Sequence, residues 1–192
     1  MEITYIKDNY YFETLNENHN LKNFFCEDDD LNEFLKDDAL RQQQEKLNLT
    51  KLIICDDEII GYVTLLADGI KLKDIKSEET RLTIQEKLET GNDKLVPAIK
   101  IGRFAVDKKY TNNGLGSHLL RNILVNVRFI SENYVGVRFV VVNAYAKAYE
   151  FYVERNNFTC LKNDENKIRE KLEKIKKQNP TQTFYLYIDL LN

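Results

Sequence analysis

The chain has 192 residues, of which 43% are hydrophobic and 31% are charged, and its formal net charge is −3. This length and composition fit one globular domain, and the slight negative charge argues against a strongly basic nucleic-acid binder. Apolar runs stay well short of the roughly 20 residues of a membrane span, and the N-terminus lacks the basic start and apolar core of a signal peptide. We therefore expect a cytoplasmic protein with no membrane segment.

The charge is unevenly distributed along the chain. Between Lys94 and Arg155 there are ten lysines or arginines and four acidic residues, so this span is near +6 and the remainder is near −9. Such a positive span fits an anionic ligand, and it leaves open whether that ligand is a cofactor, an RNA or both.

The three cysteines, Cys26, Cys55 and Cys160, are odd in number and lie far apart. Neither they nor the two histidines, His19 and His118, have the spacing of metal ligands, so we expect reduced, buried thiols and no metal site. The residues around the histidines also give no sign of a partner for a catalytic cysteine.

The first third of the chain predicts strands separated by helical pieces. In chain order these are a strand within Ile3–Leu15, a turn at Asn16–Asn20, a helix after the acidic run Glu27–Asp30, a helical piece at Ala39–Lys46, and strands at Thr50–Cys55 and Ile59–Leu66 joined by the turn Asp56–Glu58. We expect Asp29 or Asp30 to cap the first helix, because acidic side chains suit a helix N-terminus. Its apolar face would consist of Leu31, Phe34 and Leu35.

The middle of the chain centres on a strand, a turn and a helix. The elements expected here are a polar helix within Ile70–Gly91 ended by Asn92 and Asp93, a lead-in at Leu95–Ala98, a buried strand at Ile99–Val106, a polar turn at Asp107–Asn113, and a helix from Leu115 with an apolar stripe at Leu119, Ile123, Val127 and Ile130. Gly102 interrupts the apolar strand, which often marks a bulge or a close approach of backbone to ligand.

The start of that helix suits an anion. The first turn of a helix leaves N–H groups without intrahelical partners, and the helix dipole is positive there. Small residues let a phosphate approach these groups, and the suitable ones here are Asn112, Asn113, Gly114, Gly116 and Ser117. Lys108 and Lys109 add positive charge just before the turn. The sharper interpretation is a site for a pyrophosphate-bearing ligand, and the alternative is a turn that uses its glycines only to bend.

Two common phosphate motifs are excluded at this turn. A dinucleotide fingerprint needs a small residue three positions after Gly116, where the chain has Leu119. A P-loop needs lysine and then serine or threonine after the glycine, where the chain has Ser117 and His118.

The last third of the chain predicts alternating strands and helices. They are a strand at Val137–Val142, a short helix at Ala146–Arg155 ended by Asn156 and Asn157, a strand at Phe158–Leu161, a charged helix at Lys162–Lys177, and a final strand at Phe184–Leu190. The whole order predicts a mixed sheet flanked by helices.

This order, together with two motifs, resembles the GNAT superfamily of acyl-CoA-dependent N-acetyltransferases. Members carry an Arg/Gln-x-x-Gly-x-Gly/Ala turn after the fourth strand, and Thr111–Gly116 matches both glycines but has Thr111 in the first position. The segment Ala148–Phe158 is similar to the family's A-x-x-F-Y-x-x-x-G-F segment, with Asn157 in place of its glycine. The resemblance implies an α+β fold with a central mixed sheet of about six to seven strands. It also implies one domain over residues 1–192, with helical insertions near 70–91 and 162–177.

Three further segments resemble the acetyltransferase toxins of toxin–antitoxin pairs. They are Phe24–Leu35, Ile53–Leu65 and Val96–Asp107. These toxins acetylate the amino group of aminoacyl-tRNA and block translation, so the resemblance implies charged tRNA as acceptor and an antitoxin protein as partner. The alternative interpretation of these apolar segments is shared core packing.

The resemblance also implies roles for particular residues. Backbone N–H groups of Phe104, Ala105 and Val106 would bind the thioester region of acetyl-CoA, and Tyr152 would protonate the departing thiolate or orient the sulfur. The pyrophosphate would lie on the backbone of Thr111, Asn112, Asn113, Gly114, Leu115, Gly116 and Ser117.

Four residue roles stay open or minor. Asn143 would either bind the pantetheine arm or cap the next helix, and Arg103 would face RNA, a carboxylate or solvent. We expect His118 to be exposed, and Tyr152 has the alternative role of a core aromatic residue. The sequence identifies no general base.

Two other functions remain at this point. One is an enzyme of the same fold that acetylates a small amine or a protein, and the other is a non-catalytic module that binds acyl-CoA and regulates a partner. In each case acetyl-CoA is the expected ligand, and a second copy of the chain is a further expected partner, because such enzymes often pair.

Overall fold

The computed structural model describes residues 1–89, 91, 93–161 and 165–191. The chain forms two compact units. We call Met1–Leu66 together with Ile101–Ile123 the first unit, and Ala67–Lys100 together with Leu124–Asn192 the second unit. None of the helices in the described ranges is long and apolar enough to cross a membrane.

The described strands form one seven-stranded sheet in the order β1-β2-β3-β4-β5-β7-β6. Their bounds are β1 Tyr11–Thr14, β2 Leu49–Cys55, β3 Glu58–Lys71, β4 Leu95–Val106, β5 Phe139–Tyr145, β6 Thr159–Cys160 and β7 Thr183–Asp189. β1 and β2, β2 and β3, β5 and β7, and β6 and β7 pair antiparallel. Neighbours β4 and β5 are joined through a helix, the connection that parallel strands need. The predicted mixed sheet flanked by helices is therefore confirmed.

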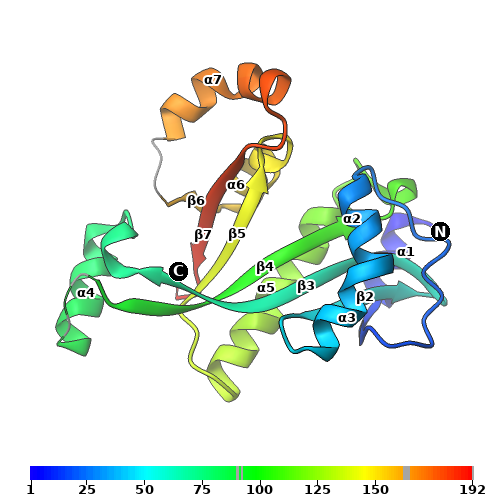
Figure 1. Ribbon diagram of the computed structural model, residues 1–192, viewed down its shortest axis with the longest axis horizontal. Coiled ribbons are helices and arrows are strands. Elements are labelled where there is room, and N and C mark those ends of the chain that lie inside the picture. Colours follow the sequence, from blue (N-terminus) through cyan, green and yellow to red (C-terminus); the bar gives the residue numbers. More distant parts are fainter. Residues whose placement is uncertain (90, 92, 162–164, 192) are drawn as a thin grey trace. The chain divides into compact units, whose positions relative to one another are not determined.

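In the first unit, both faces of strand β2 are covered. The helical elements here are α1 Ile3–Asn9, α2 Asp29–Glu33, the π-helix η1 Phe34–Asp38, α3 Ala39–Gln44, the 3-10 turn η3 Lys108–Tyr110, and the first part of α5 Leu115–Asn133. Because side chains alternate along a strand, Leu52 packs with Leu35 and the helices α2 and α3, whereas Ile53 packs with Ile6 and Leu115 of helices α1 and α5. Figure 1 shows α2 and α3 lying along strands β2 and β3.

The strand predicted within Ile3–Leu15 is present in the second half of this segment, and the first half is a helix that the sequence did not predict. Residues Ile3–Asn9 form helix α1, and only Tyr11–Thr14 is a strand. The β-branched residues Ile3, Thr4 and Ile6 favour a strand locally. However, Ile6 is fully buried against α5, with Ile3 and Tyr10 packed beside it. Positions 3, 6 and 10 share one helical face, so tertiary packing overrides the local preference.

Helix α2 is capped one residue earlier than predicted. The side chain of Asp28 accepts a hydrogen bond from the backbone N–H of Asp30, so Asp28 is the N-cap. Asp29 and Asp30 occupy the first turn, where their charges favour the helix dipole. The predicted apolar face is confirmed for Phe34 and Leu35, which are buried, and for Leu31, which is half-buried.

Strand β3 extends further than the sequence predicts. The hairpin turn is confirmed, with Asp56 and Asp57 at φ of 46° and 60°. The strand then continues to Lys71, where a helix is expected, because Ile70 is buried in a cluster with Val96 and Phe139.

The predicted polar helix is therefore shorter than expected. After the 3-10 turn η2 Leu72–Asp74, helix α4 covers Glu78–Leu88 with Ser77 as its cap. It ends at Glu89, before the predicted stop at Asp93, and Asn92 lies outside the described residues.

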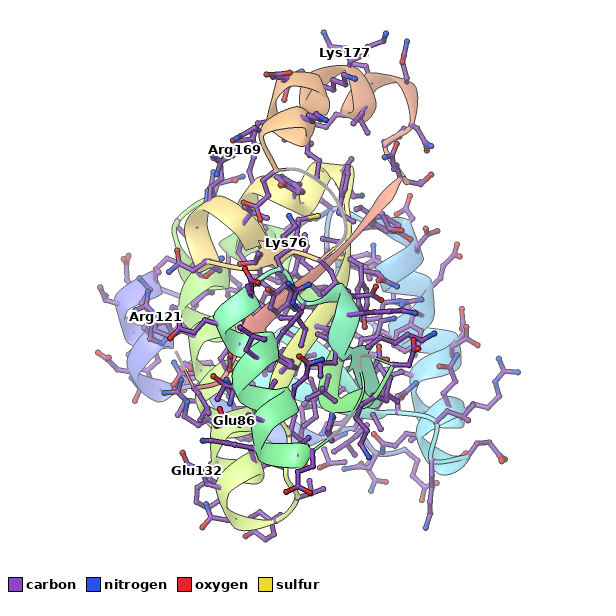
Figure 2. The ribbon with its side chains drawn as sticks, turned by 90° about the vertical axis from the view of Figure 1, so that its left-hand side faces the viewer. Lys76, Glu86, Arg121, Glu132, Arg169 and Lys177 are labelled. Carbon is purple, nitrogen blue, oxygen red and sulfur yellow. The ribbon has the colours of Figure 1, made fainter. Side chains whose placement is uncertain are left out.

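The remaining helices of the second unit follow the predicted order. They are the 3-10 turn η4 Ala146–Ala148, α6 Tyr149–Asn156 and α7 Glu165–Gln178. Residues 162–164, the predicted start of the last helix, lie outside the described residues. Ile168 and Leu172 of α7 are buried as predicted. Figure 2 shows Arg169 and Lys177 projecting outward from the same helix.

Candidate active site

The end of strand β4 presents alternate backbone groups to its two edges. Asp107 donates its N–H to the carbonyl of Ile60 in strand β3 at 2.9 Å. A Cβ atom on Gly61 would lie 2.7 Å from the carbonyl oxygen of Ala105, so this edge is closed against β3. Because N–H directions alternate along a strand, the N–H groups of Phe104 and Val106 point away from β3. Of the three predicted thioester-binding residues, these two have suitably directed amides and Ala105 does not.

The loop after β4 is fixed by a buried carboxylate. Asp107 is 1% exposed, and its two oxygens accept the backbone N–H groups of Phe25 at 3.1 Å and Lys109 at 2.9 Å. Lys108 donates its N–H to the carbonyl of Phe25 at 2.8 Å. Two hydrogen bonds therefore tie the loop to the segment before α2, and the third, from Lys109 to Asp107, holds the loop itself. Sequence reasoning missed Asp107 as an anchor, although its place directly after a buried strand was a usable signal.

The positive charge predicted for this loop is partly neutralised. The Nζ atom of Lys109 lies 2.6 Å from Glu58, and the hydroxyl of Tyr110 donates to the same carboxylate at 3.0 Å. The hydrogen bond from Lys109 lowers the pKa of Glu58. The Thr111 hydroxyl donates to the carbonyl of Lys108 at 3.1 Å and lies 3.4 Å from Glu27. Lys109 is therefore paired with a carboxylate, so it adds less positive charge to the turn than the sequence suggests.

The start of helix α5 is an exposed turn with two left-handed residues. Asn112 has φ 62° and Gly114 has φ 80°, a conformation that suits glycine and asparagine. The side chain of Asn113 caps the helix by accepting the N–H of Leu115 at 3.1 Å, so that amide has a partner within the loop. Residues 112–114 are exposed, and Gly116 and Ser117 are half-buried.

This turn fits an anionic group. The side chains of Leu115 and Leu119 are fully buried, so packing in the core fixes the N-terminal end of the helix. No heavy atom lies within 4 Å of a Cβ built on Gly114, so the space above the turn is open. Exposed amides at a fixed helix N-terminus are suitable for a diphosphate.

His118 is not exposed as predicted. It is half-buried, with its ring edge against Tyr10 at 5.7 Å between centroids and its Nε2 atom 3.4 Å from the side-chain nitrogen of Asn122. Burial, with the nearby charges of Lys7 and Arg121, lowers the pKa of His118, so the imidazole is neutral at pH 7. It therefore adds no charge to the turn.

The interruption at Gly102 has a packing cause. A Cβ atom there would lie 2.8 Å from a side-chain carbon of Leu66 on strand β3. The close approach that the sequence indicates is thus made to a neighbouring side chain.

Tyr152 lies in the second unit, on helix α6, and is 6% exposed. Its ring makes edge contacts with Phe151 at 5.0 Å and Phe158 at 5.3 Å between centroids. Burial raises the pKa of Tyr152, so the phenol stays protonated at neutral pH. The helix ends at Asn157, which has φ 58°, and this confirms the predicted left-handed ending.

One turn earlier in α6, Tyr149 is fully buried with its edge against Phe184. Its hydroxyl has no hydrogen-bond partner among the described residues. Burial raises the pKa of Tyr149 to about 12.

Asn143 lies exposed on strand β5, opposite Tyr185 of strand β7. The cap positions of the following helical elements are Tyr145 and Ala148, and neither element has a side-chain cap. The capping role is therefore excluded, and the role toward the pantetheine arm stays a prediction.

The predicted site residues divide between the two units. Phe104 to Ser117 lie together in the first unit, along the end of β4, its loop and the first turn of α5. Asn143 and Tyr152 belong to the second unit.

Comparisons with known proteins identify the family and the fold. The model of the Acetyltransferase (GNAT) family matches residues 10–158. A crystal structure of a tyrosine-to-phenylalanine mutant of KacT is 20% identical over 95% of this chain and 96% of that chain, with a TM-score of 0.73. AtaT complexed with acetyl-methionyl-tRNAfMet is 19% identical over 94% and 95% of the two chains, with a TM-score of 0.71. A mutant AtaT toxin bound to acetyl-CoA and the C-terminus of the antitoxin AtaR is 20% identical over 96% and 95%, with a TM-score of 0.66.

The solved structures establish the fold, and the family model spans well over half of the chain. The predicted enzyme class, an acetyltransferase that uses acetyl-CoA, is confirmed at this level. The chain belongs to the GNAT family of acetyltransferases.

Proposed function

We propose that this chain transfers the acetyl group of acetyl-CoA to the α-amino group of aminoacyl-tRNA and thereby stops translation. The observation that carries the proposal is the shared fold, over more than nine-tenths of both chains, with AtaT complexed with acetyl-methionyl-tRNAfMet. In this proposal the chain is a cytoplasmic toxin that an antitoxin protein restrains, and a second copy of the chain is a further partner. The three cysteines are all buried, which is compatible with a reducing compartment.

The first unit would bind the nucleotide end of acetyl-CoA. Amides of the turn at Asn112–Ser117, other than the one of Leu115 that Asn113 accepts, would donate hydrogen bonds to the diphosphate, with Gly114 keeping the approach open. The amides of Phe104 and Val106 would hold the thioester region and stabilise the oxyanion that develops on its carbonyl. The buried Asp107 keeps the loop between these two parts in place.

Tyr152 would supply the proton that the leaving group needs. The amine nitrogen forms a bond to the carbonyl carbon, the carbon–sulfur bond breaks, and the sulfur takes its proton from the Tyr152 hydroxyl. The amine proton goes to water, which restores the phenol through exchange. The phenol of Tyr152 is protonated at pH 7, so it can donate a proton but cannot act as a base.

The proposal needs no strong general base. The α-amine of an aminoacyl ester has a lower pKa than a lysine side chain, so more of it is neutral at pH 7. The enzyme would then act mainly by holding two reactants together. We also propose that residues 1–192 act as one domain, in which 70–91 and 162–177 are insertions and Asn143 contacts the pantetheine arm.

Release of free thiol from acetyl-CoA tests the proposal. The wild-type chain is offered charged tRNA, the same tRNA without its amino acid, a polyamine and a peptide with a free N-terminus. We expect release with charged tRNA only, and acetylated aminoacyl-tRNA as the product. Release with the polyamine or peptide alone would replace the proposal with a small-amine or protein acetyltransferase. Binding of acetyl-CoA without release in any reaction would favour a regulatory module.

A further inference from the structure

Three cations of the first unit lie over aromatic rings. The Nζ atom of Lys36 is 3.9 Å from the ring centroid of Phe25, and that of Lys108 is 5.7 Å from the same centroid. The guanidinium of Arg103 is 4.9 Å from the ring centroid of Phe34. We call these five residues the cation–aromatic surface. They come from the loop before α2, the π-helix η1, strand β4 and the loop after it.

Phe25 is exposed and yet firmly held. Its ring is 43% exposed, whereas its backbone is bonded on both sides to the loop after β4 through Asp107 and Lys108. The next residue, Cys26, is bonded at its N–H and its carbonyl by the buried side chain of Asn32, at 2.8 and 3.0 Å. A large apolar ring fixed at the surface loses little conformational entropy when a ligand covers it.

Arg103 is positioned by η1. Phe34, in the first position of this π-helix, stacks on Tyr62 with an interplanar angle of 20°, which fixes the ring that the guanidinium lies over. A single π-turn inside a helix is frequent at functional sites. Arg103 also donates to the carbonyl of Gly102 at 2.8 Å, which leaves most of its five N–H donors for another group.

The charges of this surface are not neutralised by carboxylates. Among the described residues, no carboxylate lies within 4 Å of the charged nitrogens of Lys36, Arg103 or Lys108, whereas nearby Lys109 and Arg41 are paired with Glu58 and Asp38. Both lysines lie over the same ring, so their like charges repel each other and an anion near that ring would be attracted by both.

Two acidic residues that follow Phe25 already have other bonds. The side chain of Asp28 caps α2, and Glu27 accepts from the Thr111 hydroxyl. Because Glu27 and Asp28 are negatively charged, the positive part of this surface consists of the three cations that lie over Phe25 and Phe34.

We propose that the cation–aromatic surface binds the single-stranded 3′ end of the RNA acceptor, beside the strand end at which the acetyl group is transferred. The inference rests on the proposed function and adds the residues that recognise the acceptor. Phe25 stacks against a base, which is a mode that tolerates any sequence. Lys36, Lys108 and Arg103 contact the adjoining phosphates, which makes binding dependent on salt.

Steady-state kinetics with two acceptors tests the proposal. One acceptor is charged tRNA, and the other is the methyl ester of the same amino acid, which has the amine and no phosphate. The variants are Lys36→Gln, Arg103→Gln and Phe25→Leu. The matched control is Arg41→Gln, an exposed arginine of the same unit whose partner is Asp38.

We expect each variant to raise KM for charged tRNA about tenfold, with kcat within about twofold, and to lower the preference for tRNA over the ester by the same factor. The two charge variants also make the dependence of log(kcat/KM) on log salt less steep by about one unit. Equal losses with tRNA and ester, or an unchanged KM and salt dependence, overturn the inference. An increase of the KM for charged tRNA in Arg41→Gln as large as in the three variants also overturns the inference.

The outcome for the wild type separates the two proposals. If the wild type acetylates charged tRNA and the variants do so equally well, the proposed function stands and this surface is not its RNA site. If the wild type acetylates the ester or another amine and not charged tRNA, both proposals fall together.

Discussion

The loop before helix α5 and the helix α6 are held in place by opposite means. The loop is exposed, and polar bonds from Asp107 and Glu58 to groups far away in the sequence fix it. Helix α6 has no side-chain cap, and ring contacts of Tyr152 with Phe151 and Phe158 help to fix it.

The difference follows from what each part must offer. An anion site needs backbone N–H groups open to water, so apolar cover would destroy it and charged or polar anchors must replace packing. Burial against aromatic rings raises the pKa of Tyr152, so the phenol is protonated at neutral pH. Loss of a polar anchor should therefore damage the loop, and loss of a hydroxyl should leave α6 intact.

The largest expected effect is that of Asp107→Ala. The variant leaves the N–H groups of Phe25 and Lys109 without an acceptor inside the protein, so we expect the free energy of unfolding to fall by about 3 kcal/mol. Affinity for acetyl-CoA should fall with it. Urea denaturation and titration calorimetry measure the two effects.

The matched control is Asp93→Ala. Asp93 is 79% exposed and pairs with Lys73 at the surface, so its loss should leave the free energy of unfolding nearly unchanged. Equal losses for the two aspartates would show that the buried anchor has no special role.

The next effect is that of Tyr152→Phe, which removes the proton donor and keeps the ring. We expect kcat to fall about 100-fold with an unchanged melting temperature, because only the hydroxyl is lost. Tyr149→Phe, one turn earlier, removes a buried hydroxyl that has no partner among the described residues. It should leave kcat unchanged and keep or raise stability by about 1 kcal/mol. If Tyr152→Phe keeps full turnover, the tyrosine is a packing residue only.

The smallest effect is a pH dependence at Glu58. The hydrogen bond from Lys109 lowers the pKa of Glu58 below its ordinary 4.5. A lowered folded-state pKa means that the stabilisation is complete above pH 4.5 and is lost as the pH falls through the folded-state pKa. We expect Glu58→Gln to be about 0.5 kcal/mol less stable than the wild type at pH 7, with a smaller difference at pH 3. Denaturation at the two pH values measures this, and an equal difference at both would contradict it.

Local patterns in the sequence predicted the parts of the site that depend on near neighbours. The apolar strand, the polar turn and the striped helix are present as expected at β4 and α5, and Asn157 ends α6 in the left-handed conformation. Each is set by interactions within a few residues, such as the cap that Asn113 gives to Leu115. Each family motif is also a contiguous stretch of sequence, so the sequence was enough to indicate acetyl-CoA as the ligand.

Only the tertiary structure decided which residues far apart in the sequence form ion pairs, hydrogen bonds and packing contacts. Ile3–Asn9 is a helix because Ile6 packs on α5, Lys109 is neutralised by Glu58, 51 residues away, and Asp107 holds Phe25, 82 residues away. Lys36, Arg103 and Lys108 likewise meet aromatic rings that no local pattern connects to them. The physical reason is that ion pairs, buried hydrogen bonds and ring contacts depend on distance in space, which the chain fixes only when the sheet brings its strands together.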